Sequence, residues 1–235
     1  MRRLLLAALF VLVAAPPASA QVGYDPALSP YRDIRSGRYL ELFGGKMFGS
    51  GGSIQVGPRD GAVMGARVNF RAKNTIQVSF GGWYANTVRN IVDADDSIAT
   101  RVKPAIAHHL YGGEATLQFN FTGGKSWHSL APYAGLGLGV VKGQPTPAAD
   151  TSGYTFGTKL YFAPMLGTRV MLGQRAFIKA EAKAYFWNLK YPLNYSDEPS
   201  KQPGTGDVIN AVNRSGRRSQ YVPVPALLFG IGFAF

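Results

Sequence analysis

The adjacent histidines His108 and His109 are the residues of this chain best suited to metal binding or acid–base chemistry. Neutral imidazole ligates transition metals, and its proton titrates near neutral pH. The residues around the pair alternate between polar and apolar types, which predicts an extended strand. Neighbouring side chains of a strand point to opposite faces, so the two rings would not share one ion. We therefore do not expect the pair to form a metal site. No catalytic triad can be assembled around either histidine.

An acidic cluster, formed by Asp93, Asp95 and Asp96, is a second candidate for metal chemistry. Carboxylate oxygens are ligands that calcium prefers, but a calcium-binding loop needs ligands at more positions than this cluster offers. We therefore interpret the cluster as part of a solvated loop, and we expect neither a metal ion nor a cofactor.

The run GLGLG, residues 135–139, has the glycine content of a phosphate-binding loop. Such a loop leads into a helix whose N-terminus receives the phosphate, and no helical pattern follows Gly139. The run alternates instead, which places Gly135, Gly137 and Gly139 on one face of a strand. We expect these glycines to make room for bulky neighbours inside a narrow space.

All these residues belong to a chain in which eight segments alternate between apolar and polar residues. In one of them, Leu117 and Phe119 oppose Glu114, Thr116 and Gln118. A period of two is typical of a β-strand whose two faces meet different surroundings, and the lengths suit membrane strands of about 9–11 residues. The segments are 38–48, 61–72, 75–86, 108–122, 130–142, 156–171, 175–188 and the terminal run 226–235.

The connections between these segments alternate in length. Short links at 73–74, 123–127 and 172–174 separate long ones, as in up-and-down barrels with tight periplasmic turns and long outer loops. A soluble β-sandwich would also alternate in sequence, but it does not explain this order of connections. The sequence therefore predicts an all-β fold, an eight-stranded antiparallel transmembrane β-barrel over residues 38–235.

The N-terminus predicts export. Two arginines precede an apolar run and a small-residue ending at Ala20, which is the pattern of a cleaved signal peptide over residues 1–20. Residues 21–37 are rich in turn formers and predict an irregular periplasmic lead-in. The chain lacks cysteine, contains 29 glycines and has only 16% charged residues, against about 25% in soluble proteins. We expect it in the bacterial outer membrane.

The formal net charge of +12 raises the question of an anionic partner. Nucleic acid is not expected, because the chain is exported and its basic residues are scattered. Outer-membrane lipid and the phosphates of lipopolysaccharide are the more plausible partners. Arg214, Arg217 and Arg218, in the last long loop, are candidate lipopolysaccharide contacts, with a solvated basic loop as the alternative.

Five charged residues fall on polar strand faces near the middle of the predicted barrel: Arg67, Glu114, Lys179, Glu181 and Lys183. Eight strands enclose a space just wide enough to be filled by side chains. An isolated charge there would be costly, so we expect the five to pair and hydrogen-bond. Such an ionic network would plug the lumen and leave no wide aqueous pore.

The chain resembles the small eight-stranded outer-membrane barrels of Gram-negative bacteria, typified by the membrane domain of outer-membrane protein A and by opacity-type adhesins. In that family the last strand carries a signal that the barrel-assembly machinery reads: a polar residue, a glycine and two aromatics. Gly230, Phe233 and Phe235 match this signal, whereas Leu228 stands in the place of the polar residue. The resemblance implies that Phe235 faces lipid at the periplasmic edge.

Two prolines, Pro223 and Pro225, lack the N–H that a strand ladder needs. Because they are two residues apart, both missing hydrogen bonds would be to the same neighbouring strand. We expect them above the hydrocarbon zone, which leaves Ala226 to Phe235 to span it.

The favoured function is a non-enzymatic barrel, a monomer, with a structural, adhesive or surface-interaction role through its outer loops. A narrow channel for small anionic solutes is the alternative. A lipid-A-modifying enzyme is a third reading, although His128 and Ser129 would lie on the wrong side for an outer-leaflet substrate.

Overall fold

The computed structural model describes residues 28–94, 96, 99–147, 150, 152–195, 212 and 217–235. The predicted signal peptide, the lead-in up to residue 27, and Arg214 lie outside these described residues. Residues 31–235 form one unit. Its single described helix is the short 3₁₀ turn η2 (Leu193–Tyr195). Of the described helices, none is long and apolar enough to cross a membrane.

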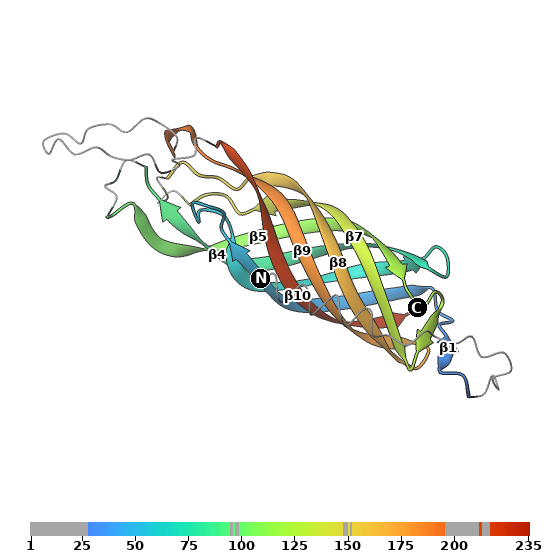
Figure 1. Cartoon of the computed structure of the whole chain (residues 1–235). Helices are drawn as coiled ribbons and strands as arrows, with labels where there is room; N and C mark the ends of the chain where they lie inside the picture. The colour runs from blue at the N-terminus through green and yellow to red at the C-terminus, as the bar shows by residue number, and fades with distance from the viewer. Residues whose placement is uncertain are drawn as a thin grey trace, which may run out of the picture. The chain divides into compact units, whose positions relative to one another are not determined.

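Eight long strands form a closed antiparallel barrel, which confirms the predicted fold class (Figure 1). Around the ring each strand pairs with the next, and β10 pairs with β2 to close it. The strands in ring order are β2 (Arg38–Ser50), β3 (Arg59–Arg71), β4 (Ile76–Val92), β5 (Val102–Asn120), β7 (Leu130–Gly143), β8 (Thr158–Leu172), β9 (Ala176–Lys190) and β10 (Ser219–Ala234). We call the end with the three short connections the turn end and the opposite end the loop end.

Two very short strands tie the lead-in to the turn end. β1 (Tyr31–Asp33) pairs with β6 (Lys125–Trp127), inside the link that the sequence predicted as a plain turn. The structure thus differs from the expectation of an irregular segment over residues 31–33. The Ile34 N–H donates to the Gly124 carbonyl at 2.9 Å, and Ile34 packs against Tyr39 and Phe177 at the mouth of the barrel. Figure 1 shows β1 at the same end as the C-terminus.

Several strands run further toward the loop end than the sequence predicted. β4 continues to Val92, β5 begins at Val102, and β10 begins at Ser219. At the predicted ends of the β4 and β5 segments the outward residues Asn86 and His109 are already polar, while inward Ala85 and Leu110 are fully buried. Beyond these ends no clear contrast between the faces remains, since Thr87 is buried and Val88 exposed, so a search for apolar outward residues ends too early.

The prolines of β10 fit the sheet because of where the ladder to β2 ends. The N–H of Ala234 points to the β9 side and that of Phe235 to the β2 side. Successive backbone nitrogens of a strand alternate between its two sides, so the nitrogens of Pro223 and Pro225, like that of Phe235, lie on the β2 side. The β10–β2 ladder runs only from Ala226 to Ala234, whereas the β10–β9 ladder runs from Ser219 to Phe233. The missing N–H groups thus face a side on which no strand pairs.

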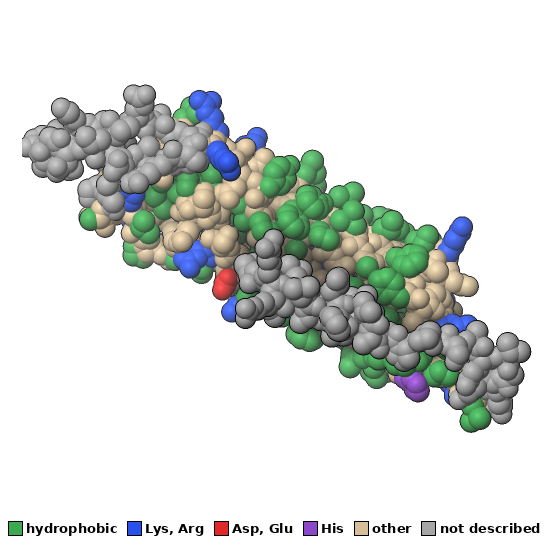
Figure 2. Space-filling model, in the orientation of Figure 1, with side chains coloured by type: hydrophobic (Ala, Val, Ile, Leu, Met, Phe, Trp, Pro, Cys, Tyr) green, Lys and Arg blue, Asp and Glu red, His purple; other side chains and the backbone are tan. Residues whose placement is uncertain are grey.

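The outer surface of the barrel carries an apolar belt. On the face shown in Figure 2, hydrophobic side chains gather in the middle, and Lys and Arg lie mostly toward the two ends. Large apolar side chains of the belt are more than a third exposed, as lipid-facing residues of membrane barrels are. Examples are Phe80 (56%), Leu117 (56%), Leu138 (61%), Leu166 (59%) and Phe229 (65%).

Candidate functional site: the packed lumen

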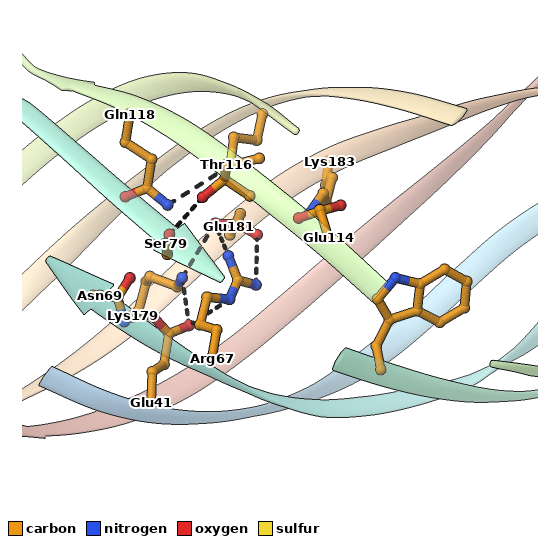
Figure 3. A network of polar contacts seen from close by, with 12 residues as sticks. Glu41, Arg67, Asn69, Ser79, Glu114, Thr116, Gln118, Lys179, Glu181 and Lys183 are labelled. Atoms are coloured by element: carbon orange, nitrogen blue, oxygen red, sulfur yellow. Dashed lines mark hydrogen bonds and ion pairs between the residues drawn. The ribbon is translucent and has the colours of Figure 1, made fainter. Parts of the chain in front are cut away.

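Four side chains from three strands form a buried ionic quartet in the lumen (Figure 3). Arg67 of β3 lies between two carboxylates: its Nη2 is 3.1 Å from Glu181 Oε1 on β9, and its Nε is 3.4 Å from Glu41 Oε1 on β2. Lys179 pairs with both Glu41 and Glu181, the latter at 3.2 Å. All four side chains are at most 4% exposed. Because each charge meets opposite charges, the quartet offsets much of its desolvation cost.

Neutral polar groups complete the quartet. The Asn69 side chain donates to Glu41 at 3.1 Å, and Gln77 donates to Asn69 at 2.9 Å. Tyr133 donates its hydroxyl to Glu181 at 2.6 Å. These bonds satisfy carboxylate lone pairs that the cations do not reach, which a buried charge cluster requires.

Glu114 and Lys183 form a separate ion pair nearer the loop end. Tyr161 donates to Glu114 at 3.0 Å, and the Trp83 indole N–H donates to the Tyr161 hydroxyl at 2.8 Å. The rings of Trp83 and Tyr185 lie 5.2 Å apart. The pair is thus the last charged layer before an aromatic one.

Arg169 is the buried cation of the turn end that lacks a carboxylate. It donates to Asn120 Oδ1 at 2.8 Å and to Gln118, and its guanidinium lies 4.3 Å from the centre of the Tyr133 ring. Within the described residues no carboxylate is at ion-pair distance from it. Hydrogen bonds and a cation–π contact replace an ion pair here.

The level of each interior layer can be followed along β9. Its inward residues Lys179, Glu181 and Lys183 are ionic, and the next three, Tyr185, Trp187 and Leu189, are apolar and at most 1% exposed. We call the interior level with Phe177–Lys183 the turn half and that level with Tyr185–Leu189 the loop half. The loop half is continuous with buried residues of the outer loops in one hydrophobic cluster.

Little space remains inside. The two cavities described along the turn half hold about 10 Å³ beside Arg67 and Glu114 and about 20 Å³ beside Arg169. Several glycines let the packing close: a Cβ at Gly137 would lie 2.8 Å from the Glu114 carboxyl, and one at Gly139 2.6 Å from the Tyr161 ring. Each of these two described cavities has room for about one water molecule.

The structure brings together all five charged residues predicted for the lumen, in two groups rather than one. Arg67, Lys179 and Glu181 lie in the quartet, and Glu114 and Lys183 form the separate pair. Sequence reasoning missed Glu41. The signal was present, because Leu40 and Leu42 on either side of Glu41 are apolar, and a strand that turns them outward turns Glu41 inward.

The described histidines and aspartates of these two clusters lie apart or have other partners. His108 is buried, whereas His109 lies on the outer face and bonds the Tyr84 hydroxyl at 2.7 Å. Lys103 approaches Asp93 and Asp96 at 3.2 and 3.3 Å, and Asp95 lies outside the described residues. Across the described ranges no three His, Asp or Glu side chains are grouped as metal ligands.

The predicted assembly-signal residues lie on both faces of β10. Phe233 and Phe235 point outward and are 52% and 69% exposed. Gly230 points inward, where a Cβ would lie 3.2 Å from Glu41 Oε1. Of the predicted lipopolysaccharide contacts, Arg217 and Arg218 are exposed beside the start of β10.

No family model and no curated protein matches this sequence. Among solved structures, the outer membrane protein OprG from Pseudomonas aeruginosa is 13% identical, with a TM-score of 0.51 over 88% of this chain and 99% of that one. Neisserial surface protein A is 14% identical, with a TM-score of 0.49 over 85% and 98% of the two chains. At these identities the likeness shows the fold alone: a small outer-membrane β-barrel.

Proposed function

We propose that this protein is a non-enzymatic outer-membrane barrel with a closed lumen, which acts through the surface and loops at its loop end. The observation that carries the proposal is the filled interior. The quartet and the Glu114–Lys183 pair occupy the turn half, and an aromatic layer lies directly above them. Side chains that fill an eight-stranded barrel leave it as a scaffold, so the parts that vary and meet partners are the loops.

The described parts of the outer loops pack together, which supports an interaction role. Buried Arg89 pairs with Asp150 of the β7–β8 connection, and Tyr195 donates to the Val92 carbonyl at 2.6 Å. Tyr154 of the β7–β8 connection and Val56 of the β2–β3 connection join Tyr195 in one hydrophobic cluster. Loops packed on a common core present a defined surface, which lowers the entropic cost of binding.

Planar-bilayer recording of the refolded protein tests the proposal. We expect no steady conductance from the parent. As a positive control, an established porin recorded under the same conditions should conduct steadily. A parent that conducts steadily would refute the closed lumen.

An anion channel is the second candidate, and one observation favours it. Arg169 leaves the described turn half with more cations than carboxylates. Such a lumen would pass anions in preference to cations. If the parent conducts, an anion selectivity that disappears in Arg169→Gln would establish this alternative in place of the closed barrel.

A further inference from the structure

A second feature lies on the outer wall of the barrel, where β8 and β9 separate. The ladder between these strands ends at Tyr161 and Trp187, so their last residues toward the loop end do not pair with each other. A pocket of about 620 Å³ opens there, between the end of the β7–β8 connection, β8, the β9 end and Tyr221 of β10. We call it the wall pocket. It is separate from the small lumen cavities.

The wall pocket is basic. Lys159 and Lys190 both line it, and none of its lining residues is acidic. Within the described part of the chain, neither lysine has a carboxylate at ion-pair distance. Lys159 is half-buried, with its Nζ 5.1 Å from the centre of the Phe156 ring. Two cations held near each other without a counter-charge favour an anion between them.

The pocket also offers groups that suit a sugar. Asn188 lines it, and the side-chain oxygen of Asn188 is buried without a donor among the described residues. An unsatisfied acceptor of this kind is suited to a ligand hydroxyl. The rings of Tyr191 and Tyr221 supply apolar faces with polar edges, as pockets for small polar ligands commonly do.

The position of the pocket along the barrel axis indicates where its ligand would come from. Leu160 is 79% exposed at its lower edge and continues downward into the apolar belt through Phe162. Asn188 and Lys190 lie at its upper edge, where the outward residues of β9 become polar. A pocket at this boundary lies level with lipid headgroups. The backbone N–H of Tyr191 donates to the Arg218 carbonyl at 2.9 Å, which places the exposed Arg218 near the rim.

We propose that the wall pocket binds the phosphorylated saccharide headgroup of an outer-leaflet glycolipid, with a phosphate between Lys159 and Lys190 and a sugar against Asn188 and the tyrosines. The inference rests on the proposed outer-membrane placement, but not on the closed lumen. It also gives the predicted contacts Arg217 and Arg218 a neighbouring site that the sequence did not reveal.

Calorimetric titration of the refolded protein in detergent with lipopolysaccharide tests this. Replacing both lysines by glutamine should weaken binding by about tenfold or more, because two charge-assisted contacts are lost. The matched control replaces Lys46 and Lys125, exposed lysines that do not line the pocket, and should change affinity less than about twofold. Equal affinity of the parent and the Lys159/Lys190 variant would overturn the proposal.

A second variant and a set of probes separate the remaining outcomes. Asn188→Asp places a carboxylate beside the phosphate and should weaken binding without touching the lumen; unchanged affinity would contradict the site.

Dephosphorylated lipopolysaccharide should bind the parent as weakly as intact lipopolysaccharide binds the double variant. Phosphatidylglycerol binding as tightly as lipopolysaccharide would reduce the pocket to a general anionic contact and refute saccharide recognition. A soluble glucosamine phosphate that binds equally well would refute a membrane source. Conductance of the same protein reports on the closed lumen independently.

Discussion

The turn half and the loop half of the barrel interior are built from the same eight strands, but from opposite kinds of side chain. In the turn half the interior holds the ionic quartet, and the exterior is the apolar belt. In the loop half the interior is mostly apolar, with Leu110 and Leu189 fully buried beside a few buried polar groups such as His108, while Asn86 and Lys190 face outward. The contrast follows the solvent: where lipid covers the wall the polar groups lie inside, and where water covers it the apolar groups do.

This inversion teaches that one strand can serve two solvents. β9 has a single unbroken alternation, yet its inward residues change from Lys183 to Tyr185 and its outward residues from Phe186 to Asn188 within a few positions. The turn half is specified by charge pairing, which is costly when incomplete. The loop half is specified by packing, as in a soluble protein. Substitutions that alter a side chain to a similar extent should therefore change the free energy of unfolding by different amounts in the two halves.

The largest effect is expected from Glu181→Gln, which keeps the shape of the side chain. Arg67 and Lys179 would then share Glu41 alone, and the free energy of unfolding should fall by about 3–5 kcal/mol. Urea unfolding of the detergent-refolded protein measures the loss. The double variant Lys179→Met/Glu181→Gln removes one charge of each sign and should recover part of it. If the single variant were as stable as the parent, water would fill the turn half.

A smaller effect is expected from the loop half, and it should follow volume rather than charge. Leu110→Ala should cost about 2–5 kcal/mol, because it leaves a cavity in a fully buried site, whereas the volume-conserving Leu110→Met should cost less than about 1.5 kcal/mol. The same urea series measures both. A Met variant as damaging as the Ala variant would mean that this half is not an ordinary packed core.

The next prediction maps the boundary between the halves from outside. Leu117→Arg, in the apolar belt, should destabilise the barrel by about 2–4 kcal/mol in lipid bilayers, and Asn86→Arg, above it, by about 0–1 kcal/mol. Unfolding in phospholipid vesicles provides the measurement. Equal losses of stability at both positions would mean that the lipid-covered belt extends toward the loop end beyond the boundary between the two halves.

The smallest effect concerns the Arg89–Asp150 pair in the outer loops. Burial by itself raises the pKa of Asp150, but hydrogen bonds from Ser152 and Arg89 outweigh it and hold that pKa below its ordinary value. A lowered pKa stabilises the loop above the unfolded value of about 3.9, and this contribution disappears as the pH falls through the folded pKa.

Limited proteolysis of the β7–β8 connection should therefore accelerate as the pH falls from 5 to below about 4. Asp150→Asn should be cut faster already at pH 7, with little further change on acidification. If parent and variant had the same pH profile, the pair would not hold the loop.

The turn half could be predicted from sequence, and the loop half could not. Leu117 and Phe119 against Glu114 and Gln118 is a clear pattern, so the strand and its charged face were foreseeable. Around His109 the sense of the pattern changes, because Leu110 points inward and His109 points outward, and the pattern no longer indicates which side faces lipid. Which charges meet across the lumen also depended on the register between strands, which the composition of one segment does not contain. β1 and β6 were missed because three residues carry no period.

The prolines of β10 also bear on the order in which the barrel forms. β2 and β10 stand at opposite ends of the chain, so their pairing closes the longest loop and loses the most chain entropy. The prolines let this ladder begin only at Ala226, while hairpin neighbours such as β9 and β10 pair over a longer stretch. Contacts between distant segments form late. We therefore expect the β2–β10 ladder to be the last to form during folding. In the folded protein its backbone hydrogen bonds should open most often, so its amide protons should be the first to exchange with solvent.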